Sequence, residues 1–575
     1  MFKECLKEAN EVYVSKLSYG QTDHRITWHP LDLLSETNFW IRTQKEPEDM
    51  SGTIPIFLSW LCLLLLNPIS GSRILVLPVD GSHWINMEVI LQELHSRGHE
   101  LTVLRSAKSW FIPSNSSIYT SIDVIMLEDE SDKDFANKML QDVMECRRSH
   151  GFIRTLYQQN MLTSMLAKGH EILARAAALM LDDPVFIKKL RDAEFDLMLT
   201  DPALPLGVLL GSYLKLPMVL NVRWINSGEG HLTLAPSPVS YVPVSGSELH
   251  DKMDFQERTK NMLHYLYSVY EQHVIINPHY SDLFQRHFPP GTDLLSVQRA
   301  ADIWLLRADF VFEFPRPTMP NVVYIGGFQC KKAKPLTAEL ETFMQSSGEH
   351  GVVVMSLGSY VSALPREVTE AIAAAFAQLP QKVVWKFAGE KPSSLGSNTL
   401  LMKWLPQKDL LGHPKTRAFV AHGGTNGMYE AICHGVPVVG LPLLFDQFDN
   451  LLRLRVRGAA RVVEVHSLTK ENFLEALKDV LETPSYLNRI QHLSLLHHDR
   501  PLSPMDTAIF WIEYVIRNQG AAHLQPAAFS LPWYSYFCLD VAVFIMAVLG
   551  ALVWAVVLVI KVLCCRRFRR KIKAE

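Results

Sequence analysis

The clearest chemical signal in the chain lies in residues 404–450, where a glycine-rich turn precedes a helix. The apolar run at 416–420 is typical of a short buried strand, and the His-Gly-Gly triplet at 422–424 follows it with residues that let the backbone approach a ligand. A helical pattern then starts at Thr425 and runs to His434, where a glycine follows. With Thr425 as N-cap, free backbone N–H groups would face a ligand beside the triplet. The pattern therefore predicts an anion site that suits a pyrophosphate.

Side chains on either side of this helix carry groups that could bind a base and hydroxyls. Trp404 offers a flat face for a base, and Glu430, Asp446 and Gln447 supply hydrogen-bond acceptors and donors. Taken singly, each feature has an ordinary structural interpretation. A tryptophan is usually core, a Gly-Gly pair is usually a turn, and Asp446 could cap a helix. The ordered set, however, favours a ligand site.

A second set of chemical groups lies in the first half of the chain. His83 directly follows a strand-like run, and Asp201 ends another one in the sequence LMLTDP. Because parallel strands end at the same edge of a sheet, a hydrogen bond between the two side chains is geometrically reasonable. An imidazole, with an ordinary pKa of about 6.5, suits a general base near neutral pH, and a carboxylate would orient it. A histidine in a loop is more often a surface or core residue, so this pairing is a hypothesis.

The first half of the chain shows the pattern of a βαβ scaffold for these groups. A strand is expected at 73–79, a helix at 86–97 and a strand at 101–104, with the first loop at 80–84. A long, mostly helical segment precedes another buried strand at 195–199.

A second βαβ series starts at Gly351 with a strand that runs into a Ser/Gly turn. It continues through the 404–450 stretch, and helices at 469–482 and 505–517 close the soluble part. Two doubly wound halves joined near 325–350 imply a cleft at the carboxyl ends of their strands, where such sheets bind ligands.

Length and composition limit the classes of function. A chain of 575 residues exceeds what one core usually serves, so at least two domains are expected. With 56 basic and 59 acidic residues, nothing suggests a nucleic-acid surface. The eight cysteines show no metal-ligand spacing and no dense framework, which leaves few candidates for a structural disulfide.

An apolar segment at 50–71 has the pattern of a secretory signal peptide, with a core too short to span a bilayer. It lacks a basic start and follows a polar extension, residues 1–49. We expect that translation begins productively at Met50, or that residues 1–49 are a non-homologous extension, and that the mature chain begins near Ser72. A signal anchor is the alternative.

A second apolar segment, 541–560, carries no charge over twenty residues and is long enough to cross roughly 30 Å of hydrocarbon. The basic tail 561–575 follows it, so the positive-inside rule places this tail in the cytosol and the preceding domains in the lumen. Lysines at positions 571 and 573 resemble the di-lysine retrieval signal of endoplasmic reticulum membrane proteins. Asn115 begins an N-glycosylation sequon that would face the lumen. We therefore predict a single-pass type I protein of the endoplasmic reticulum membrane.

The 404–450 stretch resembles the signature of the UDP-dependent glycosyltransferases, and most closely that of the animal UDP-glucuronosyltransferases. The resemblance covers roughly Ile74 to Glu575 and implies an α/β fold of the GT-B type, with two Rossmann-like doubly wound domains facing across a cleft. It implies an inverting single displacement without a metal or other cofactor. The motifs SHW and TDP match those that carry the family's catalytic base and its partner, here His83 and Asp201.

The resemblance also implies a donor site for uracil, ribose, diphosphate and sugar. Its residues would be Arg307, Ser359, Trp404, Gln407, His422, Gly424, Asn426, Glu430, Asp446 and Gln447. One departure from the family pattern is Phe445, which stands where a small residue is usual and could reshape the sugar pocket. An Asp132-Lys133-Asp134 triplet resembles the metal-binding motif of other glycosyltransferases, but its acidic surroundings favour a solvated surface.

The predicted function is transfer of glucuronate from UDP-glucuronate to a hydroxyl of a small lipophilic alcohol or phenol. The alternatives are the same reaction with UDP-glucose, UDP-xylose or UDP-N-acetylglucosamine, and a non-catalytic membrane protein on the same fold. Expected partners are the UDP-sugar, the acceptor and membrane lipid, with a homo-oligomer left open. The predicted segments are 1–49 (extension), 50–71 (signal peptide), 72–330 (acceptor domain), 331–525 (UDP-sugar domain), 541–560 (membrane helix) and 561–575 (tail).

Overall fold

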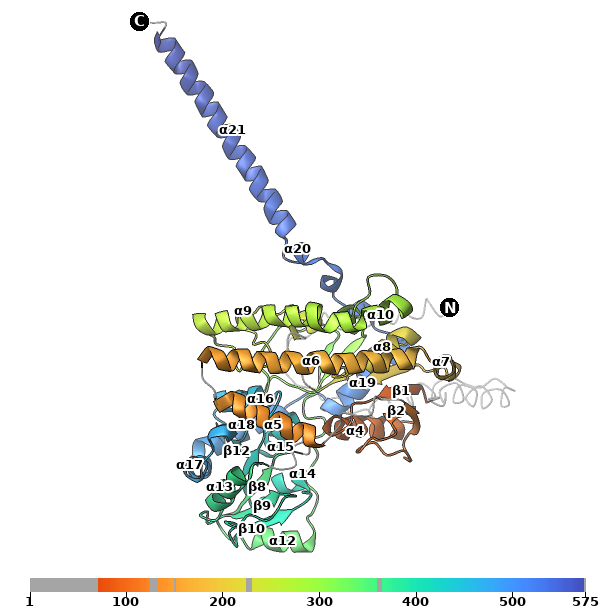
Figure 1. The fold of residues 1–575 in the computed structure, drawn as a ribbon, viewed down its shortest axis with the longest axis vertical. Helices are drawn as coiled ribbons and strands as arrows, with labels where there is room; N and C mark the ends of the chain where they lie inside the picture. Colours follow the sequence, from red (N-terminus) through yellow and green to blue (C-terminus); the bar gives the residue numbers. More distant parts are fainter. Residues whose placement is uncertain (1–70, 125–132, 149–150, 224–229, 359–363, 573–575) are drawn as a thin grey trace, which may run out of the picture. The chain divides into compact units, whose positions relative to one another are not determined.

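The computed structural model describes residues 71–124, 133–148, 151–223, 230–358 and 364–572 (Figure 1). The predicted extension 1–49, nearly all of the predicted signal peptide 50–71, and Ser359 lie outside these residues. So does part of the Asp132-Lys133-Asp134 triplet, whose side chains are not described.

The first half of the chain forms a fully parallel seven-stranded sheet with the order β3-β2-β1-β4-β5-β6-β7. The strand order reverses direction between β1 and β4, which is the point where doubly wound sheets bind ligands. The strands are β1 (Arg73–Leu77), β2 (Glu100–Ser106), β3 (Thr120–Val124), β4 (Leu197–Thr200), β5 (Met218–Val222), β6 (Ile303–Leu306) and β7 (Val322–Tyr324).

Alternation along β1 explains why helices cover both faces of this sheet. Leu75 and Leu77 pack into a core with α6 and α8, whereas Ile74 and Val76 pack into a core with α4 and α19. Successive side chains of a strand point to opposite faces, so a strand that is apolar from Ile74 to Leu77 has to be covered on both faces. The helices of this half are α4 (Ser82–Ser96), α5 (Lys133–Arg148), α6 (Gly151–Leu181), α7 (Pro184–Asp192), α8 (Leu206–Leu214), η2 (Gly230–Leu234), α9 (Phe255–Tyr270), η3 (Glu271–Ile276), α10 (Asn277–His287) and α11 (Leu294–Arg299).

The second half forms a parallel six-stranded sheet with the order β10-β9-β8-β11-β12-β13. Its strands are β8 (Val352–Ser356), β9 (Lys382–Lys386), β10 (Thr399–Met402), β11 (Thr416–Ala421), β12 (Val438–Gly440) and β13 (Ala460–Val462). Val353 and Met355 of β8 face a core with α13 and α17, and Val352 and Val354 face a core with α14 and α15. The helices are α12 (Ala338–Gln345), α13 (Arg366–Phe376), α14 (Gln407–Leu411), α15 (Thr425–His434), α16 (Gln447–Val456), η4 (Val465–Ser467), α17 (Lys470–Glu482), α18 (Pro484–His498) and α19 (Pro504–Asn518).

Two helices pack on the sheet of the other half. Ile509 and Ile512 of α19 are fully buried in the core that lies between α4 and the first sheet. Met139 and Met144 of α5 pack into a core of the second sheet. The two halves are therefore joined by an exchange of helices as well as by the connecting segment.

A disulfide joins Cys330, near the start of that connecting segment, to Cys433 on α15. Beyond α19 the chain continues through η5 (Ala522–Leu524), η6 (Ala527–Ser530) and α20 (Trp533–Tyr536) into α21 (Leu539–Ile572). Residues Leu539–Arg567 of α21 are apolar enough and long enough to cross a membrane, and their most apolar window is not buried against the protein.

Two expectations about helix starts are wrong. The helix expected at 86–97 begins at Ser82, so His83 lies in its first turn rather than in a loop. The N-cap of α15 is Gly424, not Thr425, which is the first helical residue. The backbone of Gly424 is extended, and a Cβ there would lie 2.6 Å from His422 Nε2, so this position needs glycine more than it needs a capping side chain.

Candidate active site

A buried histidine–aspartate pair lies at the carboxyl edge of the first sheet. His83 comes from the first turn of α4, and Asp201 directly follows β4, the neighbour of β1. The His83 Nδ1 atom lies 2.6 Å from Asp201 Oδ2, and the residues are only 6 % and 2 % exposed. The structure thus brings together the two side chains that the sequence predicts as base and partner.

Burial and charge act in opposite directions on this pair. Burial lowers the pKa of His83 below 6.5, and the carboxylate of Asp201 opposes that effect only in part. Burial alone would raise the pKa of Asp201, but the charges of His83 and Arg307 lower it overall. The favoured state near neutral pH is therefore a neutral imidazole beside an ionised carboxylate, as a general base requires.

Arg307 lies against this pair rather than on the second half of the molecule. It directly follows β6, is 3 % exposed, and its Nη2 atom lies 3.4 Å from Asp201 Oδ2. Among the described residues, its Nε and Nη1 atoms have no hydrogen-bond partner. Buried donors of a cation are costly to leave without an acceptor, so they favour an anionic group beside the pair.

A second arginine, Arg223, belongs to the site although sequence reasoning missed it. It directly follows β5, and its Nη1 atom donates to Oγ of Ser82, the first residue of α4. Its charge lowers the pKa of both His83 and His422, and is itself attracted by Asp446. The sequence feature that could have identified Arg223 is its position directly after a buried strand, which Asp201 and Arg307 share. Since one guanidinium acts on both histidines, both rings lie within electrostatic range of Arg223, although His83 belongs to the first half and His422 to the second.

The N-terminal ends of α4 and α15 meet at this junction. Asn86 Nδ2 donates to Asn426 Oδ1 at 2.5 Å. Asn426, predicted as a donor-binding residue, thus connects the helix that carries His83 to the helix of the predicted anion site.

The predicted anion site lies at the end of β11 and the start of α15. A Cβ on Gly358 or Gly424 would come within 2.7 Å or 2.6 Å of His422 Nε2, so the imidazole lies directly against both glycines. Burial lowers the pKa of His422 to about 4, which keeps the ring neutral at physiological pH. Gly424 caps α15 without a side-chain hydrogen bond, so the first N–H groups of the helix receive no acceptor from a cap side chain.

Glu430 and Gln407 form the next part of the predicted donor site. Gln407 Nε2 donates to Glu430 Oε2 at 2.6 Å, and burial raises the pKa of Glu430 to about 7. Trp404 is 60 % exposed, and the Lys386 ammonium lies 4.6 Å from its ring centre. Its exposed ring can therefore stack against a planar base.

Asp446 and Gln447 are both engaged with the protein. Asp446 Oδ2 accepts from Thr425 Oγ1 at 3.0 Å and from Asn450 Nδ2 at 2.7 Å. Gln447 Oε1 accepts from the backbone N–H groups of Leu443 and Leu444, each at 2.9 Å. Gln447 thus shapes the loop before α16, and it is Asp446 that interacts with the helix of the anion site.

Phe445 occupies this loop with a left-handed backbone, φ 55°, and is 49 % exposed. A left-handed backbone conformation is costly for a residue with a bulky side chain, and Phe445 adopts it directly before Asp446.

Asn115, in the predicted sequon, is exposed in the segment after β2.

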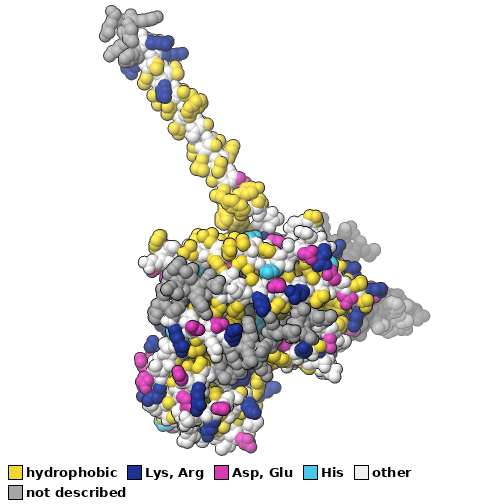
Figure 2. All heavy atoms as spheres, in the orientation of Figure 1, with side chains coloured by type: hydrophobic (Ala, Val, Ile, Leu, Met, Phe, Trp, Pro, Cys, Tyr) yellow, Lys and Arg dark blue, Asp and Glu magenta, His cyan; other side chains and the backbone are white. Residues whose placement is uncertain are grey.

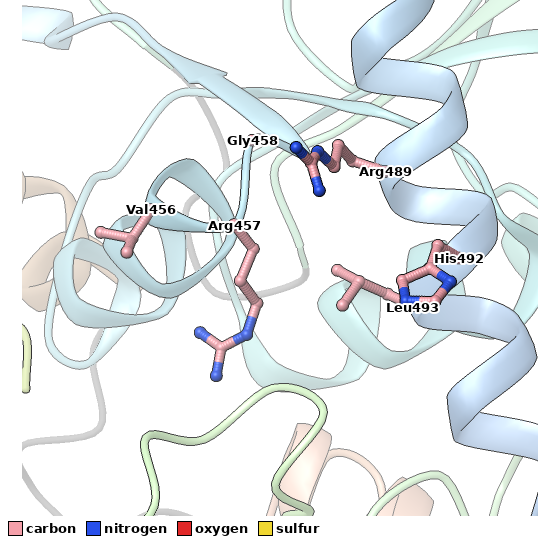
Figure 3. A pocket seen from close by; sticks show the side chains of 6 residues that line it. All are labelled: Val456, Arg457, Gly458, Arg489, His492 and Leu493. Carbon is pink, nitrogen blue, oxygen red and sulfur yellow. The ribbon is translucent and has the colours of Figure 1, made fainter.

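A separate hollow of about 400 Å³ lies between α16 and α18 and is lined by none of the predicted site residues (Figure 3). Its lining residues are Val456, Arg457, Gly458, Arg489, His492 and Leu493.

Within the described residues, no group of three or more His, Cys, Asp or Glu side chains is arranged to hold a metal.

Two parallel α/β sheets, each covered by helices on both faces, give the chain a fold of the GT-B type. Solved structures support the fold. The glycosyltransferase VinC, solved in complex with DTDP, matches 78 % of this chain and 100 % of its own with a TM-score of 0.53 at 17 % identity. The glycotransferase of kitacinnamycin matches 77 % of this chain and 99 % of its own, with a TM-score of 0.52 at 17 % identity.

Residues 72–575 match the family described as "UDP-glucoronosyl and UDP-glucosyl transferase". The mouse UDP-glucuronosyltransferase 1-2 is 41 % identical over 505 residues, which is 87 % of this chain and 93 % of that protein. The human UDP-glucuronosyltransferase 2B15 is 40 % identical over 533 residues, 90 % of this chain and 99 % of that protein. The chain belongs to this family and is a glycosyltransferase enzyme.

Proposed function

We propose that the chain transfers glucuronate from UDP-glucuronate to a hydroxyl of a small lipophilic alcohol or phenol. Relatives at 40–41 % identity over most of the chain carry the name UDP-glucuronosyltransferase, which supports this donor. The buried pair of His83 and Asp201 is the observation that carries the mechanism, because it keeps an oriented neutral base at the junction of the two halves.

In the proposed reaction the acceptor oxygen attacks the anomeric carbon and its proton passes to the imidazole of His83. The bond between that carbon and the diphosphate oxygen breaks, and UDP leaves with the bonding electron pair. The ionised Asp201 stabilises the imidazolium that forms, as an aspartate does in hydrolase triads. A single displacement inverts the anomeric configuration, so an α-linked donor would give a β-glucuronide.

Charge on the site is arranged for an anionic donor. The backbone N–H groups at the start of α15 and the neutral imidazole of His422 would donate hydrogen bonds to phosphate oxygens. Arg307 and Arg223 would offset the negative charge of the diphosphate or of the sugar carboxylate. Trp404, Gln407 and Glu430 would hold the base and the ribose hydroxyls.

The proposed location is the endoplasmic reticulum membrane, with α21 as the single span and the basic tail in the cytosol. The apolar stretch Leu539–Arg567 and the arginines and lysines that follow it support this orientation. An exposed Asn115 is consistent with a glycan in the lumen.

Competition among labelled UDP-sugars, measured on microsomes that contain the full chain, tests the donor. Transfer from UDP-glucuronate is the expected result; transfer from UDP-glucose without any from UDP-glucuronate would overturn the donor assignment. His83→Ala should bind UDP as the wild type does but lose about 10²–10⁴-fold in transfer rate, the usual contribution of a general base. Unchanged turnover in that variant would remove His83 from its role.

A further inference from the structure

The side chain of Asp449 connects the start of α16 to the first half of the molecule. Asp449 Oδ2 accepts from the backbone N–H of Gly246 at 2.6 Å, and Asp449 Oδ1 accepts from the backbone N–H of Glu248 at 3.0 Å. Both donors lie in the loop 242–249, which precedes α9 in the first half. These two hydrogen bonds therefore cross from one half of the molecule to the other.

Asp449 is buried, unlike many acidic residues of the second half. Figure 2 shows acidic and basic side chains over the visible surface of that half, whereas Asp449 is only 8 % exposed. Burial raises the pKa of Asp449, and the charge of Arg453 and the two N–H groups of the loop oppose that effect. A buried carboxyl group is costly without hydrogen-bond partners, so Asp449 needs the loop 242–249 in place.

The backbone of the loop is shaped for this side chain. Gly246 and Glu248 have φ values of 85° and 54°, both in the left-handed region. Backbone in which left-handed residues alternate with others can turn successive N–H groups towards one acceptor. A left-handed conformation is unfavourable for a glutamate and persists where the surroundings hold it. The bond from Glu248 N–H to Asp449 is one contact that holds it.

The loop is also fixed to α9, so the connection reaches the body of the first half. Asn261 of α9 is fully buried, and its Oδ1 accepts from the backbone N–H of Val244 at 2.8 Å. Its Nδ2 donates to Val242 O at 2.8 Å. Lys260 Nζ donates to Ser247 O at 2.5 Å. A displacement of α16 would therefore be resisted by α9 as well as by the loop.

An ion-pair network adds a second connection between α16 and the same loop. Arg147 of α5 is buried, and its Nη2 atom donates to the carboxylate of Glu248. Its Nη1 atom donates to Glu464 Oε2 at 3.2 Å, and its guanidinium carbon lies 3.5 Å from the ring centre of Phe448. A guanidinium over an aromatic ring is an attractive arrangement. Phe448 and Asp449, consecutive residues of α16, are thus both connected to Glu248.

The position of α16 matters because its first turn lies at the predicted sugar site. Asp446 precedes the helix directly and accepts from Thr425, the first residue of α15. His83, the proposed base, belongs to the other half. Transfer requires the acceptor oxygen and the anomeric carbon in a narrow range of distance and angle. Contacts that fix α16 relative to the first half therefore limit the error in that geometry.

We propose that Asp449 is a positioning residue, which holds the two halves at the spacing that glycosyl transfer requires by binding the loop 242–249, and which takes no part in binding UDP. The proposal rests on the proposed function, because it takes His83 as the base and the start of α15 as the diphosphate site. Loss of Asp449 should consequently reduce kcat and leave the affinity for UDP unchanged.

Asp449→Asn tests this role, and the chain offers a matched control. The amide keeps the shape of the side chain but has a single acceptor oxygen, so one N–H group of the loop loses its partner. Asp302 also accepts from two backbone N–H groups, those of Met218 at 2.9 Å and Ala521 at 2.6 Å. Both donors belong to the cores of the first sheet, so Asp302→Asn removes the same kind of bond within one half.

The first measurement is kinetic and uses the purified full chain in nanodiscs. Asp449→Asn should lose about 10- to 100-fold in kcat, while its Kd for UDP by isothermal titration stays within about twofold of the wild type. Asp302→Asn should lower the thermal midpoint and keep kcat within about twofold of the wild type. An unchanged kcat in Asp449→Asn, an equal loss in Asp302→Asn, or a matching rise in the Kd for UDP would each overturn the proposal.

The second measurement does not depend on activity. Spin labels on Val185→Cys of α7 and Leu487→Cys of α18, both exposed positions, place one probe on each half. With UDP bound, Asp449→Asn should broaden the distribution of distances between the probes, and Asp302→Asn should not. A distribution as narrow as that of the wild type would overturn the proposal. The cysteines replaced by serine for labelling are 5, 62, 538, 564 and 565.

A milder variant serves if Asp449→Asn does not fold. Glu248→Gln weakens the ion pair with Arg147 and keeps the backbone N–H that Asp449 accepts. It should lower kcat and broaden the distances in the same direction, and wild-type values for both would overturn the proposal. A wild-type chain that transfers no sugar, with distances that Asp449→Asn broadens, would overturn the proposed function and leave the connection between the halves in place.

Discussion

At the scale of single residues, the proposed chemistry depends on the burial of His83 and Asp201, which are only 6 % and 2 % exposed. His83 and Asp201 could be named from the sequence because both stand at strand ends and resemble family motifs. Their burial and the two arginines around them could not be named. Burial lowers the pKa of His83, Asp201 opposes this effect, and the positive charges of Arg223 and Arg307 add to it. Burial and these charges together determine whether the imidazole is neutral at the pH where the enzyme acts.

A pH profile tests this balance. The imidazole is a base only when neutral, which holds above its pKa, and burial places that pKa below 6.5. The value of kcat, measured at saturating UDP-sugar so that donor affinity does not enter, should therefore remain level as pH falls from neutral to 6.5 and decline only below it. In Asp201→Asn the loss of the carboxylate should lower the pKa of His83 further, move the decline to lower pH, and reduce the plateau by about 10²–10⁴-fold. A decline centred above 6.5, or one that Asp201→Asn leaves in place, would contradict this account.

Glu430 predicts a pH dependence of a different kind, in binding rather than in rate. Burial raises its pKa to about 7, so below that pH the free protein holds a neutral carboxyl group. If ribose hydroxyls bind the carboxylate, one proton has to leave, and UDP affinity should fall by up to about tenfold for each pH unit below that pKa. Isothermal titration with UDP measures this slope. The matched control is Glu430→Gln, in which the part of the slope due to this group should disappear; an equal slope in both proteins would exclude Glu430.

At the scale of elements, the turn between β11 and α15 requires glycine at position 423. Gly423 has φ 94°, and a Cβ there would lie 2.7 Å from both Gln447 O and Leu451 Cγ. The turn is therefore shaped by close packing against α16 as well as by the ligand that the glycines would admit.

Gly423→Ala should destabilise the protein by about 1–3 kcal/mol, because a side chain there is both conformationally strained and in contact with backbone. UDP affinity should fall with it, since the start of α15 would be displaced. The control is Gly458→Ala: it has a similar positive φ of 71°, but its Cβ would meet only Arg489 Cγ at 3.5 Å. Urea unfolding followed by intrinsic fluorescence compares the two. Equal midpoints would show that strain alone, and not the contact with α16, governs position 423.

At the scale of the whole molecule, the two halves are not successive in the chain. Helix α19 follows the entire second sheet, yet it covers one face of the first sheet, and α5 covers part of the second. The first sheet is apolar on both faces, so without α19 part of its core would be open to water. The first half, which carries His83, therefore depends for its core on residues near position 512, far from His83 in the sequence.

Ile512→Ala measures this dependence. Ile512 is fully buried, and removing its side chain should cost about 2–5 kcal/mol of unfolding free energy, the usual loss for a buried aliphatic residue. Leu495→Ala, at a position 70 % exposed on α18, should leave stability within about 0.5 kcal/mol of the wild type. The thermal midpoints of the two variants, followed by intrinsic fluorescence, decide the matter. Equal midpoints would mean that α19 contributes little to the core of the first sheet.

The sequence by itself determined the features that local pattern encodes. Apolar strand runs, the helix from Thr425 to His434 and the C-terminal apolar helix were all readable, because each depends on the periodicity of neighbouring residues. What only the tertiary structure decided are the relations between distant segments: α19 on the first sheet, Arg223 beside His83, and Gln447 turned into the backbone of its own loop. These relations depend on which apolar surfaces cover one another and on how burial alters the ionisation of side chains. A local sequence pattern predicts neither the packing nor the burial.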